Sequence, residues 1–457
     1  MKKTVAWIVP PLLNGGGGSR TIIENANYLS NNGWKSDIYI DIPKKKNKNL
    51  KEEIIKAFGK CECDIYYLDS LDSDYEVMIA TYSIHTPEIV YHSNAKHKLY
   101  FIQDFEPWFE PMGDLFLERE NSYKLGLKGI SIGKWLNHKI HYDYSMKMDY
   151  FPFCANLNIY KPLNIKKENA ICFIYQPDKP RRCDNLGINA LRIVKKLRPD
   201  VTIYFYGSSQ NEQLDFPIIN LHLLSIEECN QLYNRCSVGL CISASNPSRI
   251  PFEMMASGLP VVDIYRENNL YDYPNDAILL SSSTADAIAA SIIYILDNPD
   301  VQKSMSSKGI DFMSNYPIEK GFQTFLAHMN SLDDNHHFQN VEYLYTKKPY
   351  EYSLETKECL NNIFYSNQIK IFENVFGKIT IDVINPFSVF EIKSLILAKW
   401  SEDNQSDLEW IPFSKSNNKY TIILKKKHLK QKNIFHIYVK DIYDNMYNII
   451  QTEFKKQ

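Results

Sequence analysis

A run of four glycines near the start of the chain is the first stretch whose residue types could do chemistry. Gly15–Gly18 follow an apolar segment, and Arg20 comes two residues after the run. Glycine lets a ligand approach the backbone closely, and the N-terminus of a following helix favours an anion. Arginine adds a planar fork of donors that fits phosphate. We therefore expect five positions to face a phosphate or an acceptor: Gly16, Gly17, Gly18, Arg20 and Thr21.

The dinucleotide-binding pattern G-x-G-x-x-G explains only part of this stretch. Gly15 and Gly17 match its first two positions, but Arg20 occupies the third. Asp37 or Asp41 has the spacing to bind a ribose in such a site. The Walker pattern G-x-x-x-x-G-K-[ST] is not matched. An NAD-dependent sugar oxidoreductase or epimerase therefore stays open as an alternative.

A second stretch, "QPDKPRRCDNLG", crowds three cations into four positions after an apolar run. Lys179, Arg181 and Arg182 would lie at a strand-to-helix turn, where open α/β sheets bind their ligands. Arginine and lysine side chains at such a turn suit a diphosphate. The alternative is an ordinary basic surface loop.

A third stretch, "NPSRIPFEMMASGLPVVD", combines polar residues with a short predicted helix. Pro251 is typical of a helix start, and Gly258 and Pro260 are typical of its end. Glu253 in the first turn could accept hydrogen bonds from two ribose hydroxyls, with Ser248 and Arg249 beside it. The alternative is that Glu253 only caps the helix.

The segment "QDFEPWFEP" holds carboxylates and an aromatic ring, which are common sugar-binding groups. Gln103, Asp104, Glu106 and Trp108 are our candidates for contacts with an acceptor. The alternative is a surface turn shaped by its two prolines. His85, which follows another predicted strand, either lines the same cleft or has a structural role.

The elements that must position these groups follow two alternations of strand and helix. The pattern "TVAWIVP", glycine turn, helix, "KSDIYIDI" is one βαβ unit, and "NAICFIYQ" opens a second series. We predict an α/β protein with one Rossmann-like domain over residues 1–160 and a second over 161–333. A partly helical linker over 334–369 then leads to a β-sandwich over 370–457, where short alternating strands are separated by turn residues.

Taken together, the three stretches resemble family 4 glycosyltransferases of the GT-B fold, in which two Rossmann-like domains face a cleft. "FEMMASGLPVV" looks like their E-A-M-A-S-G-x-P-V-V signature, "PDKPRR" their basic diphosphate loop, and "NGGGGSRT" their glycine loop. The resemblance covers about residues 4–330, and it implies that residues 1–160 are an acceptor-side domain and residues 161–333 a nucleotide-sugar domain. It implies catalytic roles for Asp104 and Glu253, and donor binding by a larger set: Lys179, Arg181, Arg182, Gly207, Ser248, Arg249 and Glu253.

Three positions depart from the family pattern. Glu253 matches the second glutamate of a Glu–seven residues–Glu pair, but the first position is Ser245. The His-Asp that many members carry at an N-domain strand end is here Gln103-Asp104. The first basic position of the diphosphate loop is Gln176. The family's usual catalytic contacts therefore cannot be copied directly onto this chain.

"YFIQDFEPWFEPMGD" is further similar to a subgroup containing bacterial rhamnosyltransferases that use dTDP-rhamnose. The resemblance implies transfer of a sugar from a dTDP- or UDP-sugar to a lipid-linked or oligosaccharide acceptor of a cell-surface polysaccharide such as a capsule or cell-wall glycan. It also implies retaining chemistry without a metal or a cofactor. Asp72-Ser73-Asp74 matches the D-x-D of metal-dependent transferases, but so short a pattern in an acidic loop is weak.

The C-terminal stretch "LAKWSEDNQSDLEWIPF" resembles the Ig-like repeat of group B streptococcal surface proteins, with one glycine and one aspartate missing. That resemblance predicts a fold and not an activity. Sugar binding, docking to other glycan-assembly enzymes, peripheral contact with the inner membrane face and structural support all stay open. A non-catalytic sugar-binding scaffold is thus the third candidate function.

Bulk properties exclude several classes of partner. The net charge of −2 gives no reason to expect nucleic acid. The nine cysteines contain no C-x-x-C pair, which favours reduced thiols and a cytoplasmic location. Pro10 and Pro11 interrupt the N-terminal apolar run, which is predicted to be a buried strand and not a signal peptide. The sequence contains no apolar run long enough to predict a transmembrane helix.

Overall fold

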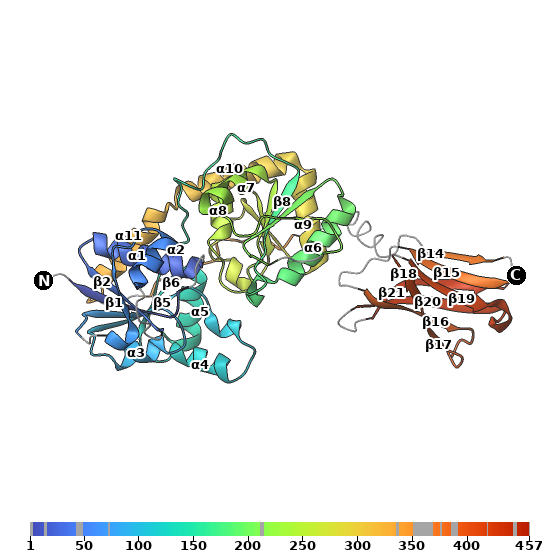
Figure 1. Cartoon of the computed structure of the whole chain (residues 1–457), viewed down its shortest axis with the longest axis horizontal. Coiled ribbons are helices and arrows are strands. Elements are labelled where there is room, and N and C mark those ends of the chain that lie inside the picture. The colour runs from blue at the N-terminus through green and yellow to red at the C-terminus, as the bar shows by residue number, and fades with distance from the viewer. Residues whose placement is uncertain are drawn as a thin grey trace. The chain divides into compact units, whose positions relative to one another are not determined.

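The structure is a computed structural model that describes residues 3–12, 16–42, 49–71, 74–210, 214–334, 338–350, 369–374, 377–384, 392–417, 419–441 and 446–456. The chain divides into two compact units (Figure 1). One comprises residues 1–187, 198–284 and 291–350, and it contains both parallel sheets. The other comprises residues 188–197, 285–290 and 351–457, and it contains the C-terminal antiparallel strands.

The N-terminal sheet has seven strands in the order β3-β2-β1-β4-β5-β6-β7, and every pairing is parallel. Its strands are β1 (Thr4–Val9), β2 (Lys35–Ile40), β3 (Asp64–Tyr67), β4 (Val77–Ala80), β5 (His97–Ile102), β6 (Lys128–Ile132) and β7 (Met148–Phe151). Its helices are α1 (Gly17–Asn31), α2 (Leu50–Phe58), α3 (Thr86–His92), α4 (Asp114–Ser122) and α5 (Lys134–Tyr144). The predicted strand–turn–helix–strand unit at the N-terminus is confirmed, with Ile22, Ala26 and Leu29 buried on one face of α1.

The second sheet has the order β10-β9-β8-β11-β12-β13 and is also parallel. Its strands are β8 (Ala170–Ile174), β9 (Thr202–Tyr206), β10 (Ile219–Asn220), β11 (Val238–Leu240), β12 (Val261–Ile264) and β13 (Ile278–Ser281). The helices of this part are α6 (Asp184–Leu197), α7 (Ile226–Arg235), α8 (Ile250–Ala256), α9 (Ala285–Asp297), α10 (Pro299–Ser314) and α11 (Ile318–Asn330). Both sheets place the predicted ligand-binding turns after the carboxyl ends of their strands.

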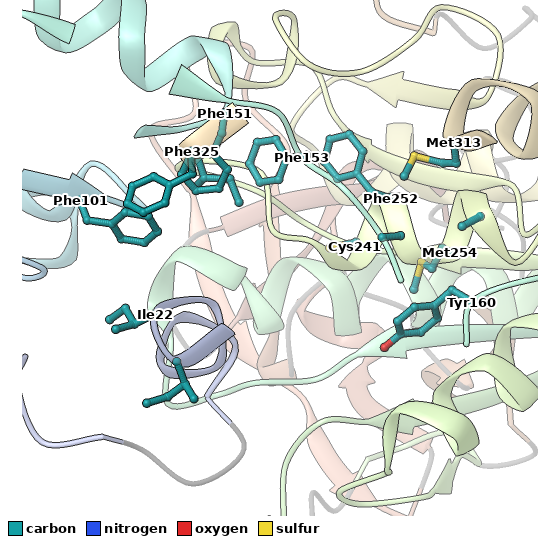
Figure 2. Close-up of a cluster of buried hydrophobic side chains, with 14 of the residues drawn as sticks. Ile22, Phe101, Phe151, Phe153, Tyr160, Cys241, Phe252, Met254, Met313 and Phe325 are labelled. Atoms are coloured by element: carbon teal, nitrogen blue, oxygen red, sulfur yellow. The ribbon is translucent and has the colours of Figure 1, made fainter. Parts of the chain in front are cut away.

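A continuous apolar core connects the two halves. Figure 2 shows Phe101, Phe151 and Phe325 grouped together, with Phe153 and Phe252 facing each other beyond them. The rings of Phe153, after β7, and Phe252, in α8, stack with centroids 4.7 Å apart. This contact anchors the N-terminus of α8 against the first half.

The last helix of the predicted second domain (161–333) packs on the first half. Residues 318–330, which we assigned to the second domain, form α11 and pack on α1 and β7 of the first half. Phe325 lies 5.4 Å from the ring of Phe101 and 5.7 Å from that of Trp7. The apolar face of α11 finds its buried partners in the N-terminal sheet, which a boundary drawn along the sequence cannot reveal.

Part of the predicted linker, residues 338–350, packs against the second half. Residues 338–350 lie against the second sheet: Tyr345 N donates to Leu270 O at 2.8 Å, and Tyr350 N donates to Leu280 O at 2.8 Å. They form no helix, so the helical expectation is wrong for this stretch. The remainder of the predicted linker, residues 351–368, lies outside the described residues.

The C-terminal strands form two four-stranded antiparallel sheets, β14-β15-β19-β18 and β17-β16-β20-β21. Their bounds are β14 (Ile369–Glu373), β15 (Lys378–Ile384), β16 (Ile392–Trp400), β17 (Glu409–Pro412), β18 (Ser414–Ser416), β19 (Lys419–Lys425), β20 (Lys432–Asp441) and β21 (Met446–Lys455). Alternate residues of both sheets, such as Ile381 and Leu397, share one core, as in a β-sandwich. Strand β18 was missed because all three of its residues are exposed and show no apolar alternation.

Among the described residues, no helix has the length and apolar character needed to cross a membrane.

Candidate functional site

The glycine turn leads into α1 as predicted. Gly16 is the N-cap residue, and the helix begins at Gly17. Gly18 lies directly against the loop after β5, because Gln103 Nε2 donates to Gly18 O at 3.2 Å and a Cβ at Gly18 would meet that amide at 3.4 Å. The absence of a side chain at Gly18 therefore serves the approach of Gln103 as well as that of any ligand.

Thr21 does not face a ligand-sized space. Its hydroxyl donates to Gly17 O at 2.9 Å within α1, and the residue is 5% exposed. The cavity that it lines, together with Glu24, Asn25 and Arg249, has a volume of about 20 Å³. Such a cavity holds about one water molecule. The prediction of Thr21 as a contact to phosphate or acceptor is therefore wrong in this arrangement.

Asp104 is buried where the two halves meet. It is 8% exposed, and its Oδ1 accepts hydrogen bonds from the backbone N–H groups of Phe105 (2.9 Å) and Asn246 (3.0 Å). Its Oδ2 accepts from the Ser245 hydroxyl at 3.1 Å and lies 3.2 Å from Arg181 Nε. The carboxylate is thus fully engaged with the second half of the protein. The catalytic role that the resemblance implies for Asp104 stays a prediction.

The three predicted cations do come together in the turn after β8. Arg181 and Arg182 lie in a short 3-10 helix, η3 (Pro180–Arg182), just before α6. Burial, together with the charges of both arginines, lowers the pKa of Lys179 to about 8. Arg182 is 8% exposed, and its buried Nη1 has no hydrogen-bond partner among the described residues. A buried cationic group without a partner is unfavourable, so this cluster has the electrostatics of an anion-binding site.

The turn over residues 243–246 lies beside these cations, and the sequence analysis did not predict its place in the site. From its own half, Ser243 N donates to Asp263 Oδ1 at 2.8 Å, and Asn268 Nδ2 donates to Ser243 O at 2.9 Å. From the first half it is held by Asp104. The one available signal was the polar run "SASNPS" after a buried strand, which marks a turn without indicating its partners.

Glu253 lies in a second cluster, at the start of α8. Burial raises its pKa, opposed by the charge of Arg249, by a hydrogen bond from Tyr160 and by the charge of Arg20. Its side chain keeps 13% exposure. Arg20, in α1 of the first half, is thus one of the charges that act on Glu253.

Arg249 is not free to bind phosphate. Its Nη1 donates to Glu24 Oε2 of α1 at 3.0 Å, and its Nε lies 3.9 Å from Glu253 Oε1. The predicted donor contact of Arg249 is therefore replaced by an ion pair between the two halves. Neighbouring Ser248 accepts from Ile250 N at 3.3 Å and lies 3.8 Å from Cys241 Sγ, so it is bound to its own turn.

Glu106 is turned away from any acceptor. It is 5% exposed, accepts a hydrogen bond from Ser83 N at 2.6 Å, and lies 3.9 Å from Arg119 Nη1. Arg119 also donates to Glu110 Oε1 at 2.6 Å. The two glutamates of "QDFEPWFEP" therefore serve to hold the loop on α4, because Arg119 on that helix neutralises them. The predicted acceptor contact of Glu106 is wrong.

Glu106 should make stability depend on pH. Burial raises its pKa from the ordinary 4.5 to about 7, so between these values the folded protein keeps a proton that the unfolded chain has released. Stability from this group is then present at low pH and lost as pH rises through about 7. Glu106→Gln, which can still accept from Ser83 N, should gain roughly 1–3 kcal/mol over wild type at about pH 8 and little at about pH 5. Thermal denaturation at the two pH values measures this difference, and an equal effect at both would contradict it.

Trp108 and Gly207 lie where contacts with a ligand are geometrically possible. Trp108 is 38% exposed, its ring lies tilted against that of Trp135 with centroids 5.4 Å apart, and the guanidinium of Arg266 lies 5.9 Å from it. Gly207 follows β9 with φ of 102°, and a Cβ there would lie 2.4 Å from Ile174 Cδ1. The turn after β9 therefore requires glycine for its conformation and for space.

An open pocket of about 460 Å³ lies at the carboxyl ends of β2 and β4, lined by Asp41, Leu68, His85, Glu88, Ile89 and Glu118. His85 occupies a γ-turn, with φ of 64° and a 2.8 Å hydrogen bond from Thr86 N to Ile84 O. Its Nδ1 is 3.6 Å from Asp41 Oδ2. The imidazole of His85 is 71% exposed and lines this open pocket.

Of the two aspartates proposed for a ribose of NAD, Asp37 does not support that alternative, whereas Asp41 lines the open pocket described above. Asp37 is 1% exposed and accepts a hydrogen bond from the Tyr75 hydroxyl at 2.6 Å inside the sheet. A buried aspartate cannot reach a ribose beyond the strand ends. Within the described part of the chain, no three His, Cys, Asp or Glu side chains are arranged to hold a metal ion. Asp72 and Ser73 of the D-x-D stretch lie outside that part.

A family model and a curated protein each match part of this chain. Residues 169–293 match the family described as "WsaF, C-terminal domain". The O-antigen biosynthesis protein RfbC of Myxococcus xanthus is 24% identical over 332 residues, which cover 68% of this chain and 26% of RfbC. The chain thus spans about a quarter of the length of that curated relative.

Solved structures of similar fold include TarM of S. aureus, as a point mutant in complex with fondaparinux, alpha-GlcNAc-glycerol and UDP. It has a TM-score of 0.57 and 12% identity, over 72% of this chain and 100% of that one. Alr3699/HepE of Anabaena in complex with UDP has a TM-score of 0.55 and 12% identity, over 72% and 100%. At such identities the likeness concerns the fold. The predicted GT-B fold class, two Rossmann-like halves followed by an all-β part, is confirmed.

Proposed function

We propose that the protein is a glycosyltransferase of bacterial polysaccharide synthesis, which moves a sugar from a nucleotide-sugar donor to a hydroxyl of a growing glycan. The observation that carries the proposal is the cluster of Lys179, Arg181 and Arg182 beside the turn at 243–246, with the buried, unpartnered Nη1 of Arg182. Cations held in a low-dielectric turn stabilise a diphosphate as it leaves. The likeness to RfbC supports the biological context.

We assign the ribose of the donor to Glu253, whose partly exposed carboxylate has the acceptor oxygens that two hydroxyls need. dTDP-rhamnose is our first candidate donor, on the sequence resemblance, and UDP-sugars are the second, since TarM and Alr3699/HepE were solved with UDP. For the acceptor, a lipid-linked or free oligosaccharide, the open pocket at Asp41 and His85 offers carboxylates suited to sugar hydroxyls. Retention of configuration and activity without a metal remain part of the proposal.

The C-terminal sandwich is proposed to help dock the enzyme on other glycan-assembly enzymes or on the inner membrane face. The cytoplasm is the expected location, which the free thiols of all the cysteines that the structure describes support.

Binding of nucleotides tests the proposal directly. We expect dTDP or UDP to raise the melting temperature of the full chain, and a panel of nucleotide sugars to reveal one donor that is hydrolysed or transferred, with activity unchanged by EDTA. Stabilisation by NAD alone would point to the oxidoreductase, and no response to any nucleotide would point to the scaffold. Either result would contradict the proposed glycosyltransferase activity.

A further inference from the structure

Asp104 connects parts of the chain that are far apart in sequence. It follows β5 of the first half, yet two of its hydrogen-bond donors, the Ser245 hydroxyl and Asn246 N–H, belong to the second half. The side chain of Asn246 also binds the first half, because its Nδ2 donates to Gln103 O at 3.0 Å and to Ile132 O at 3.2 Å. The strand end of one sheet is thereby tied to the turn of the other.

The same carboxylate holds Arg181. Arg181 Nε lies 3.2 Å from Asp104 Oδ2, and the guanidinium lies 4.1 Å from the ring centre of Phe109. Arg181 O also accepts from Ala244 N at 3.2 Å, which joins the basic turn to the turn at 243–246. The position of the Arg181 fork is therefore set by an aromatic face and a carboxylate, both of which come from the first half.

The turn between them is already rigid on its other side. Asp263 accepts from Ser243 N and from the Tyr273 hydroxyl, at 2.8 and 3.0 Å, and Asn268 donates to the carbonyl oxygens of Ser243 and Ser245. A fixed turn presents the Ser245 hydroxyl and the Asn246 N–H to one place, where the Asp104 carboxylate accepts them. A glutamate at position 245 would put a second negative charge there.

We propose that Asp104 is a positioning residue that fixes Arg181 and the turn at 243–246 in the arrangement that binds the donor diphosphate. The inference rests on the proposed function. Ser245 occupies the position at which the resembled family has a glutamate. Its hydroxyl donates to Asp104, so Ser245 helps to fix this arrangement. Donor binding is thereby linked to the docking of the two halves.

A double-mutant cycle tests the link. Asp104→Asn should lower kcat/KM about 10- to 100-fold, as expected when a charged group near the reaction loses its position, and should weaken the binding of dTDP or UDP. Arg181→Ala should show a similar loss. If Asp104 acts through Arg181, the double variant is no worse than Arg181→Ala alone. Asp104→Glu, which keeps the charge, should recover part of the affinity.

Asp272 provides a matched control, because it is also a buried carboxylate that joins the two halves. It accepts from Lys134 N at 3.1 and 3.0 Å, whereas Asp104 is the carboxylate that pairs with Arg181. Asp272→Asn should lower the melting temperature but leave nucleotide affinity unchanged. Equal behaviour of the two aspartate variants, or a further loss when Asp104→Asn is added to Arg181→Ala, overturns the inference. If wild type binds no nucleotide, it is the proposed function that fails.

Discussion

Arg182→Met is expected to abolish most activity while leaving the unliganded protein as stable as wild type, or more so. The substitution keeps much of the side-chain volume and removes a charge whose buried Nη1 has no partner among the described residues. Loss of one such group from a site that stabilises developing negative charge lowers turnover about 10²- to 10³-fold. Removing a buried charge that has no partner stabilises the folded state, because the folded state no longer carries the desolvation cost of that charge.

The measurement pairs steady-state kinetics with thermal denaturation, with and without pyrophosphate. Pyrophosphate should raise the melting temperature of wild type and not that of Arg182→Met. Arg235→Met is the control, since Arg235 is ion-paired with Glu168 Oε1 at 2.7 Å, and Glu168 precedes β8 whereas the basic turn follows it. A fall in stability with full activity in Arg182→Met would remove Arg182 from the diphosphate site.

Glu253→Gln is expected to lower kcat/KM for the donor on the order of a few hundredfold, because two charge-assisted hydrogen bonds to ribose hydroxyls are worth about 1.5–3 kcal/mol each. The loss should concern the nucleoside and not the diphosphate. Affinity for UDP should therefore fall in this variant, while affinity for pyrophosphate stays at the wild-type value. Isothermal titration with both ligands separates the two contributions.

Glu24→Gln is the matched control for Glu253→Gln, because both carboxylates pair with Arg249 and only Glu253 is assigned to ribose. If the glutamates matter only by holding Arg249, the two variants will lose UDP affinity equally. Wild-type UDP affinity in Glu253→Gln would rule out the ribose assignment.

Much of the architecture follows from local patterns. The alternation of apolar strands with amphipathic helices predicted both parallel sheets, because strands buried on both faces read as continuous apolar runs. Glycine, proline and basic residues marked the turns after β1 and β8 and the start of α8, where Arg20, Lys179, Arg182 and Glu253 are found. These features depend on neighbours within a few residues, so the sequence contains them directly.

The partners of the charged groups were decided only by the tertiary structure. Asp104 pairs with Ser245, Asn246 and Arg181, and Arg249 pairs with Glu24, all of them distant in the chain. Glu106 was predicted to meet a sugar, and it faces Arg119 because α4 packs behind its loop.

The sequence by itself thus determined the sheets, the order of the elements and the chemical types at the turns. Only the folded chain decided which carboxylates are neutralised inside it and which remain available to a ligand. The physical reason is that a buried charge must find a partner or a hydrogen-bond donor, and that partner is supplied by whichever distant segment packs against it.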